Sequence, residues 1–165
     1  MHLVVINGSP RTEKKSNTAK IITSFLRGFK TEGNTSEVWH LSDREQWASA
    51  MTAYHNNEYI LIAFPLYVEN LPGILMEFIE KLNFDNDIMK EHKKKIAFLV
   101  QGGFAEASQL RCCEAYLEKL PEYLSSGFRV FFALILKHVQ RMMFRKIAKE
   151  KGCTEPLDKK VYTCS

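Results

Sequence analysis

The chain has 165 residues, an ordinary share of hydrophobic and charged residues, and a formal net charge of +4. This length suits one domain with its own core, and the composition excludes a disordered or low-complexity protein. The small basic surplus falls mainly after Lys137, a pattern that does not favour a nucleic-acid-binding protein.

The first segment predicts a strand, a polar loop and a helix. Residues 3–6 form a continuous apolar run, which is typical of a strand buried on both faces in a parallel sheet. Polar residues fill positions 9–17, and apolar residues then recur at helical spacing, at Ala19, Ile22, Leu26 and Phe29. Ser16 or Asn17 is the expected helix cap, and Gly33 is the expected stop.

The next segments repeat this alternation. Residues 37–41 predict a short strand, and residues 43–57 predict a weak helix capped by Ser42 or Asp43. Residues 59–64 predict a second strongly buried strand. The helix that follows has an apolar face formed by Ile74, Leu75, Phe78, Ile79 and Leu82.

The second half of the chain continues in the same order. Residues 96–100 predict a third buried strand, and helical spacing resumes at Leu110, Cys113, Leu117 and Leu120. Residues 128–132 predict a fifth strand and residues 134–151 a last helix. The alternation predicts an α/β fold of three layers, in which helices cover both faces of a five-stranded parallel sheet. No linker divides the chain, so residues 1–165 are expected to form a single domain.

Three segments that follow predicted strands are candidates for ligand binding, at residues 8–17, 65–73 and 101–107. The first leads into a helix N-terminus, whose unpaired N–H groups and dipole favour an anion. It also supplies hydroxyl, amide and guanidinium donors from Ser9, Arg11, Ser16, Asn17 and Thr18. These features predict a site for a phosphate monoester, with an ordinary capped loop as the alternative.

The second and third segments suit contact with a flat ring. The second supplies apolar and aromatic area from Leu66, Tyr67 and Val68. The third contains Gly102 and Gly103, which permit close approach of backbone N–H groups to a ligand. Taken alone, the second is equally compatible with a cover for the sheet end, and the third with a simple turn.

Together these motifs resemble the NAD(P)H-dependent FMN reductase family. The segments Gly8-Ser9-Pro10-Arg11 and Ser16-Asn17-Thr18 are similar to the FMN phosphate loop of that family. The segment Pro65-Leu66-Tyr67, followed by Leu71-Pro72-Gly73, is similar to its second flavin loop. The glycine pair after the 96–100 strand has the position of its third loop, and the similarity covers roughly residues 2–130.

The resemblance implies a flavodoxin-like fold with strand order 2-1-3-4-5, a bound FMN and a homodimer. It implies that the phosphate is held by Ser9, Arg11, Ser16, Asn17 and Thr18. It further implies that the isoalloxazine ring is bordered by Pro65, Leu66, Tyr67 and Val68, with Asn70 nearby. The pyrimidine edge of the ring would be approached by Gly102 and Gly103.

The function that the resemblance implies is oxidation of NAD(P)H through FMN. Hydride would pass from NADH or NADPH to N5 of the flavin, and electrons would then reach a quinone, a flavin, an azo or nitro compound, or a protein. No side chain is assigned as a catalytic acid or base. One alternative is an electron carrier like flavodoxin, against which the positive net charge argues. Another is a flavodoxin-like interaction module that binds no ligand.

The remaining features predict a cytoplasmic protein without a metal site. The N-terminus has no signal-peptide pattern, and no apolar run reaches the roughly 20 residues that span a bilayer. None of the cysteines forms a C-x-x-C pair, and His40 is expected at the surface or the boundary of the core. The basic last helix is expected to close the fold, with contact to a partner or membrane surface as the alternative.

Overall fold

The computed structural model describes residues 1–68, 70–84, 94–102, 113, 115–120 and 124. The chain divides into two compact units, residues 1–132 and 133–165, and every described residue belongs to the first. The predicted fifth strand and last helix lie outside the described residues. A single domain over residues 1–165 therefore stays a prediction.

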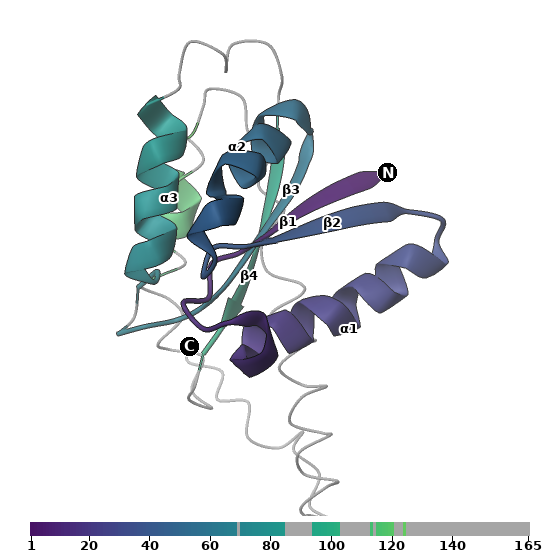
Figure 1. Ribbon diagram of the computed structural model, residues 1–165, viewed down its shortest axis with the longest axis horizontal. Coiled ribbons are helices and arrows are strands. Elements are labelled where there is room, and N and C mark those ends of the chain that lie inside the picture. Colours follow the sequence, from purple (N-terminus) through teal and green to yellow (C-terminus); the bar gives the residue numbers. More distant parts are fainter. Residues whose placement is uncertain (69, 85–93, 103–112, 114, 121–123, 125–165) are drawn as a thin grey trace, which may run out of the picture. The chain divides into compact units, whose positions relative to one another are not determined.

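Four parallel strands form the sheet, in the order β2-β1-β3-β4 (Figure 1). They are β1 (His2–Asn7), β2 (Thr35–His40), β3 (Tyr59–Pro65) and β4 (Lys95–Gln101). The last residue of β1, Asn7, pairs with His40 on one side and with Ala63 on the other. Within the described residues, this arrangement confirms the predicted parallel α/β sheet and the order of its first four strands.

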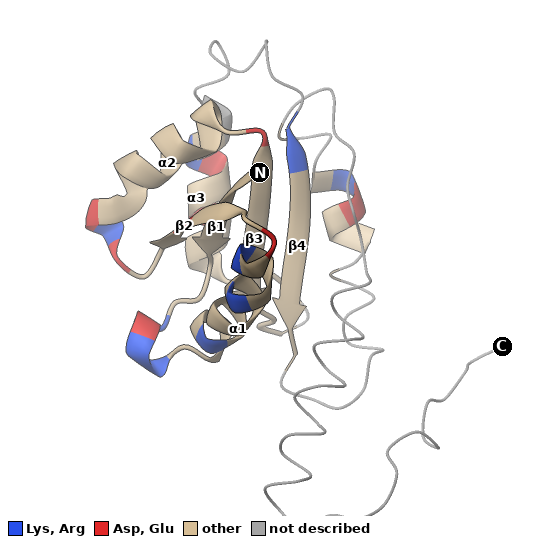
Figure 2. Cartoon of the chain, turned by 90° about the vertical axis from the view of Figure 1, so that its right-hand side faces the viewer, with Lys and Arg blue, Asp and Glu red and all other residues tan. Residues whose placement is uncertain are grey.

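Helices cover both faces of this sheet. Helix α1 (Asn17–Thr31) lies on one face, and α2 (Trp47–Asn56) and α3 (Gly73–Phe84) lie on the other (Figure 1, Figure 2). Helical residues 115–120 follow β4, and buried side chains of this part include Cys113, Leu117 and Leu120, as predicted. None of the described helices is long and apolar enough to cross a membrane.

Helix α1 forms where its capping residues and its apolar spacing predict it. The side chain of Ser16 accepts a hydrogen bond from the Ala19 N–H at 3.2 Å, and Gly33 follows the helix with a φ of +72°. Ala19, Ile22 and Leu26 are buried against the sheet, as their spacing predicts. The Phe29 ring is only half-buried and stacks on that of Phe25, with ring centroids 5.9 Å apart.

Helices α2 and α3 are held together by an ion pair and an aromatic contact. Asp43 caps a short 3-10 turn, η2 (Arg44–Gln46), from which α2 continues. The Arg44 guanidinium donates to both carboxylate oxygens of Glu77 on α3 at 2.7 Å, and this lowers the pKa of Glu77 to about 2. The Trp47 ring meets the Phe78 ring edge-on, at 5.5 Å between centroids. The α3 face is buried at Leu75, Phe78, Ile79 and Leu82 and half-buried at Ile74.

Candidate functional site

The carboxyl ends of β1, β3 and β4 lie at one edge of the sheet because the strands are parallel. Strands β2 and β3 flank β1 on opposite sides, so the strand order reverses there. The chain leaves β1 for α1 and leaves β3 for α3, and these helices cover opposite faces (Figure 1). In an open parallel sheet, such a reversal creates the crevice in which ligands bind. All three segments predicted from the sequence begin at this edge.

A buried turn joins β1 to the first of these segments. The Ser9 backbone N–H donates to Asn7 Oδ1 at 3.1 Å, and the Arg11 backbone N–H donates to Ser9 Oγ at 3.2 Å. Only 1% of Asn7 and 2% of Ser9 is exposed, so these two side chains shape the turn from inside. The Arg11 side chain is exposed, which leaves its guanidinium at the surface of the loop.

The loop enters α1 through a short 3-10 turn, η1 (Glu13–Lys15), in which acidic and basic residues adjoin (Figure 2). Ser16 then caps α1 and is fully buried. The N–H groups of Asn17 and Thr18 stand in the first turn of α1, where the helix offers them no carbonyl partner. Together with the helix dipole, they make this end of α1 attractive to an anion.

Thr18 connects α1 to the end of β4. Its hydroxyl donates to Gln101 Oε1 at 3.2 Å, and only 1% of Thr18 is exposed. The backbone carbonyl of Gln101 accepts from the Leu66 N–H at 2.7 Å. Gln101 therefore joins all three segments, although the sequence analysis did not identify it. Its position as the first residue of the predicted segment 101–107, directly after the 96–100 strand and before Gly102, was the available signal.

The segment after β3 begins with a tight turn. Tyr67 and Asn70 exchange two backbone hydrogen bonds of 2.9 and 3.0 Å, and Val68 adopts a φ of +46° between them. This left-handed conformation is unfavourable for a β-branched residue. It leaves Tyr67 42% exposed and Val68 98% exposed. The Asn70 side-chain oxygen accepts from the Leu71 N–H at 2.8 Å, which fixes the end of the turn.

The other predicted ring-contacting residues are less exposed. Pro65 and Leu66 are half-buried at the end of β3, and Gly102 is half-buried after β4. Gly103 lies outside the described residues. The structure thus brings Pro65, Leu66, Tyr67, Val68, Asn70 and Gly102 to the same sheet edge as the first loop.

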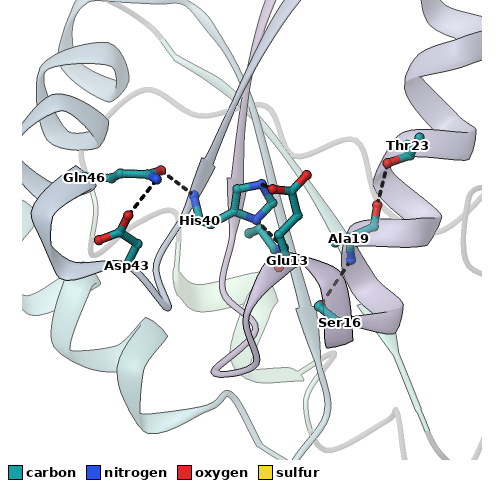
Figure 3. A network of polar contacts seen from close by, with 8 residues as sticks. Glu13, Ser16, Ala19, Thr23, His40, Asp43 and Gln46 are labelled. Atoms are coloured by element: carbon teal, nitrogen blue, oxygen red, sulfur yellow. Dashed lines mark hydrogen bonds and ion pairs between the residues drawn. The ribbon is translucent and has the colours of Figure 1, made fainter.

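His40 belongs to this edge as well, which the sequence analysis did not foresee. It ends β2, and its Nδ1 lies 3.0 Å from the Asn7 side-chain nitrogen. Its Nε2 lies 3.8 Å from a carboxylate oxygen of Glu13 in η1, and its backbone N–H donates to Gln46 (Figure 3). The predicted boundary position is confirmed, since the residue is half-buried. The contacts follow from the register that pairs Asn7 with His40.

The residues of the first loop fit a phosphate group. The N–H groups in the first turn of α1, the exposed Asn17 amide and the exposed Arg11 guanidinium are donors of the kind that phosphate oxygens accept. Gly8 lies so close to α3 that an added Cβ would stand 2.9 Å from Leu75 Cδ2, so α3 supports the base of the loop. Among the described residues, no three His, Cys, Asp or Glu side chains are grouped to hold a metal ion.

The family to which this chain belongs follows from a match over most of its length. Residues 1–139 of this chain match a protein family that has a flavodoxin-like fold. The chain belongs to this flavodoxin-like family. The flavodoxin-like fold that the loop motifs implied is therefore confirmed, and the order of the four described strands is that of the first four strands of a flavodoxin-like sheet.

Solved structures similar to this flavodoxin-like protein include two oxidoreductases and an FMN complex. The apo form of an NADH:FMN oxidoreductase, EMOB, is 19% identical, with a TM-score of 0.62 over 94% of this chain and 91% of that chain. General stress protein 14 of Treponema denticola, in complex with FMN, is 17% identical, with a TM-score of 0.57 over 93% and 99%.

FerB, an NAD(P)H:(acceptor) oxidoreductase from Paracoccus denitrificans, is 12% identical, with a TM-score of 0.60 over 92% of this chain and 97% of that chain. At these identities, the likeness shows the shared fold. No sequence among the curated proteins matches this chain.

Proposed function

We propose that this flavodoxin-like protein binds FMN and uses it to oxidise NAD(P)H. The observation that carries the proposal is the convergence of the Ser9 turn and the first turn of α1 at the point where the strand order reverses. That point combines helix N–H donors with an exposed amide at Asn17 and an exposed cation at Arg11, the chemistry that a phosphate monoester requires.

The phosphate would be held by the first loop and the start of α1. Arg11 and Asn17 are exposed and offer side-chain donors to the solvent side of the group. Ser9, Ser16 and Thr18 are buried, so their contribution is to shape the loop and to turn the backbone N–H groups toward the phosphate. The fold holds the backbone N–H donors in place before the ligand arrives, which reduces the ordering cost of binding.

The isoalloxazine ring would lie over the turn after β3. Tyr67 and Val68 present their apolar side chains to solvent at this edge, and Pro65, Leu66 and Asn70 frame the turn. Gly102, with Gly103 beyond the described residues, would approach the pyrimidine edge of the ring with backbone N–H groups. A ring placed there would cover exposed apolar area that the protein otherwise leaves in water.

When bound, FMN supplies the redox chemistry, taking hydride from NADH or NADPH and passing electrons to an acceptor. The protein's share is to bind the cofactor, to orient it and to exclude water from one side of the ring. A small-molecule acceptor is proposed, such as a quinone, a flavin, or an azo or nitro compound. The similar structures named as NADH:FMN and NAD(P)H:(acceptor) oxidoreductases support this class of reaction. A cytoplasmic homodimer is proposed as the working form.

Comparison of FMN with riboflavin tests the phosphate site directly. The two ligands share the ring system and differ in the phosphate, so wild-type protein should quench FMN fluorescence with a dissociation constant at least about tenfold lower than for riboflavin. The substitution Arg11→Ala should weaken FMN binding by about fivefold to tenfold and leave riboflavin binding unchanged. Arg27→Ala removes an exposed arginine in the body of α1 and serves as the matched control. Equal affinity for both ligands would contradict the assignment of the loop.

A further inference from the structure

The His40 ring is linked to the first loop through a buried amide. Asn7 uses both ends of its side chain, accepting from the Ser9 backbone N–H at 3.1 Å and facing His40 Nδ1 at 3.0 Å. Asn7 is 1% exposed and the His40 side chain is 16% exposed, so little water competes for these contacts. The conformation of the Ser9 turn therefore depends on which way the Asn7 amide faces.

The position of each proton in this chain of contacts follows from donor and acceptor chemistry. The Ser9 backbone N–H can only donate, so the Asn7 atom that faces it is the oxygen. The Asn7 atom that faces His40 is then the NH2 group, which donates. The Nδ1 of His40 must accept and therefore carries no hydrogen, which places the ring proton on Nε2, toward Glu13. The hydrogen-bonded arrangement requires a neutral imidazole.

The charged group in contact with the ring is a carboxylate. Glu13 of η1 faces Nε2 at 3.8 Å (Figure 3). On the side of η2, Gln46 accepts from the His40 backbone N–H at 3.3 Å and donates to an Asp43 carboxylate oxygen at 2.9 Å. From β1 the facing group is the uncharged Asn7 amide. The positive charge of a protonated ring would thus be attracted by the Glu13 carboxylate. The added hydrogen on Nδ1 would, however, break the hydrogen bond from the Asn7 NH2 group.

We propose that His40 is a positioning residue of the first loop: its neutral ring orients the Asn7 amide that shapes the Ser9 turn, and its protonation releases that turn. A hydrogen on Nδ1 would face the Asn7 NH2 group, donor against donor. If the amide turns over to relieve this, its NH2 group faces the Ser9 N–H instead. Ser9 then loses its acceptor. The conformation of the loop is therefore coupled to the charge of the His40 ring.

This inference rests on the proposed function where it concerns FMN, because the Ser9 turn is part of the proposed phosphate site. FMN affinity should fall as His40 becomes protonated. The new positive charge lies beside the Glu13 carboxylate at a partly exposed position, so its attraction for the phosphate is small. The loss of the organised turn therefore dominates.

The first test follows the loop in FMN-free protein by NMR between pH 5 and 8. In wild type, the Ser9 backbone amide and the Asn7 side-chain amide should shift with the same midpoint as the His40 ring carbons. The substitution His40→Asn places a non-titrating oxygen near the position of Nδ1, so the Ser9 signal should keep its neutral-pH value throughout. The substitution His40→Leu removes the acceptor without adding a donor, so its Ser9 signal should not respond to pH in this range and should lie between the two limits of wild type.

The second test measures FMN affinity across the same pH range. The phosphate of FMN itself takes up a proton at about pH 6, and this changes the FMN affinity of every variant equally. Between the pH at which the NMR titration finds the His40 ring neutral and the pH at which it finds the ring protonated, wild type should lose about fivefold more affinity than His40→Asn. His40→Leu should bind FMN more weakly than His40→Asn at the higher pH, because it leaves the Asn7 amide without an acceptor. Ser9 and Asn7 signals that ignore the His40 titration, or equal FMN affinities for the Asn and Leu variants, would overturn the inference. If wild type bound no FMN at any pH, the proposed function would fail. The NMR titration would still test whether protonation of His40 releases the Ser9 turn.

Discussion

Gly8 and Leu75 are in such close contact that the loop after β1 has no room for a side chain at this position. A Cβ on Gly8 would lie 2.9 Å from Leu75 Cδ2 and 3.1 Å from Leu75 Cβ, and Leu75 is fully buried in α3. The Gly8 N–H also donates to the Ala63 carbonyl on β3 at 2.8 Å. The loop therefore cannot move away from α3 without losing its hydrogen bond to the sheet.

The substitution Gly8→Ala should destabilise the protein through this contact. Relief of the overlap requires a shift of Leu75 in a packed core, which typically costs about 1–3 kcal/mol. Gly28→Ala is the matched control, because no atom lies within 4 Å of the added Cβ in an exposed turn of α1. It should raise the free energy of unfolding by up to about 1 kcal/mol. Urea unfolding measures both, and a Gly8→Ala protein as stable as wild type would contradict the packing described.

The Thr18–Gln101 hydrogen bond predicts an unequal pair of substitutions. Gln101→Leu leaves the buried Thr18 hydroxyl without its acceptor and should lower the free energy of unfolding by about 1–2 kcal/mol. Thr18→Val leaves the half-buried Gln101 amide, which water can reach, so its cost should be smaller. In the double variant both polar partners are gone, and the total cost should fall below the sum by about 1 kcal/mol. Strict additivity would show that the contact does not form in solution.

Val68 should be a site where a polar residue stabilises the protein. Its φ of +46° is unfavourable for a β-branched side chain that is 98% exposed and so gains nothing from packing. Asparagine tolerates this conformation, and Val68→Asn should raise the free energy of unfolding by about 1 kcal/mol. Val68→Ala keeps a Cβ in the same conformation and should stay within about 0.5 kcal/mol of wild type. FMN binding should weaken in both variants, since each removes apolar area under the proposed ring site.

Lys94 caps the C-terminal end of α2 from a distance in the sequence. Its ammonium donates to the carbonyls of Tyr54, His55 and Asn57 at 2.7, 2.8 and 3.1 Å, and only 4% of the residue is exposed. Lys94→Met should lower the free energy of unfolding at pH 7 by about 2 kcal/mol, because these carbonyls lose a charged donor. Lys95→Met, which removes a neighbouring exposed lysine, should cost less than about 1 kcal/mol. Similar losses for the two variants would contradict the capping role.

The same lysine predicts a rise of stability in mild alkali. Burial lowers the pKa of Lys94 from its usual 10.5 to about 8 in the folded protein. Between these values the unfolded chain binds more protons than the folded one, so stability increases with pH. The difference in unfolding free energy between wild type and Lys94→Met should therefore grow from about pH 8 to 10.5. Subtraction of the variant removes the contribution of other titrating groups, and a flat or falling difference would contradict the prediction.

The described part of the fold follows from apolar patterns, and the differences from the predicted elements lie at the ends of those elements. The predicted strand at residues 37–41 is β2 (Thr35–His40), because Leu41 is buried in the turn and its N–H donates to the Asn7 carbonyl at 3.0 Å. The predicted helix at residues 43–57 begins as a 3-10 turn, because the Asp43 side chain accepts from the Glu45 N–H. The periodicity of apolar residues does not predict such hydrogen bonds at the ends of the elements.

The candidate site was only partly predictable for a related reason. The loop residues carry recognisable local motifs, so Ser9, Ser16 and Tyr67 could be selected from the sequence. Gln101 and His40 carry no motif of their own. They reach the site because the strand register sets them beside residues far away in the chain, at Pro65 and Asn7. Such pairings depend on the assembled sheet rather than on the neighbouring sequence.

Anaerobic absorbance spectroscopy of the FMN-loaded and desalted protein tests the central proposal most directly. The protein should retain the flavin absorption bands, and NADH or NADPH should bleach them, with electrons then passed to an added quinone. Retained bands that neither nucleotide bleaches would contradict the oxidoreductase proposal and favour an electron carrier. Failure to retain FMN would contradict the proposal altogether, and the loop between Gly8 and Thr18 would then be an ordinary connection between a strand and a helix.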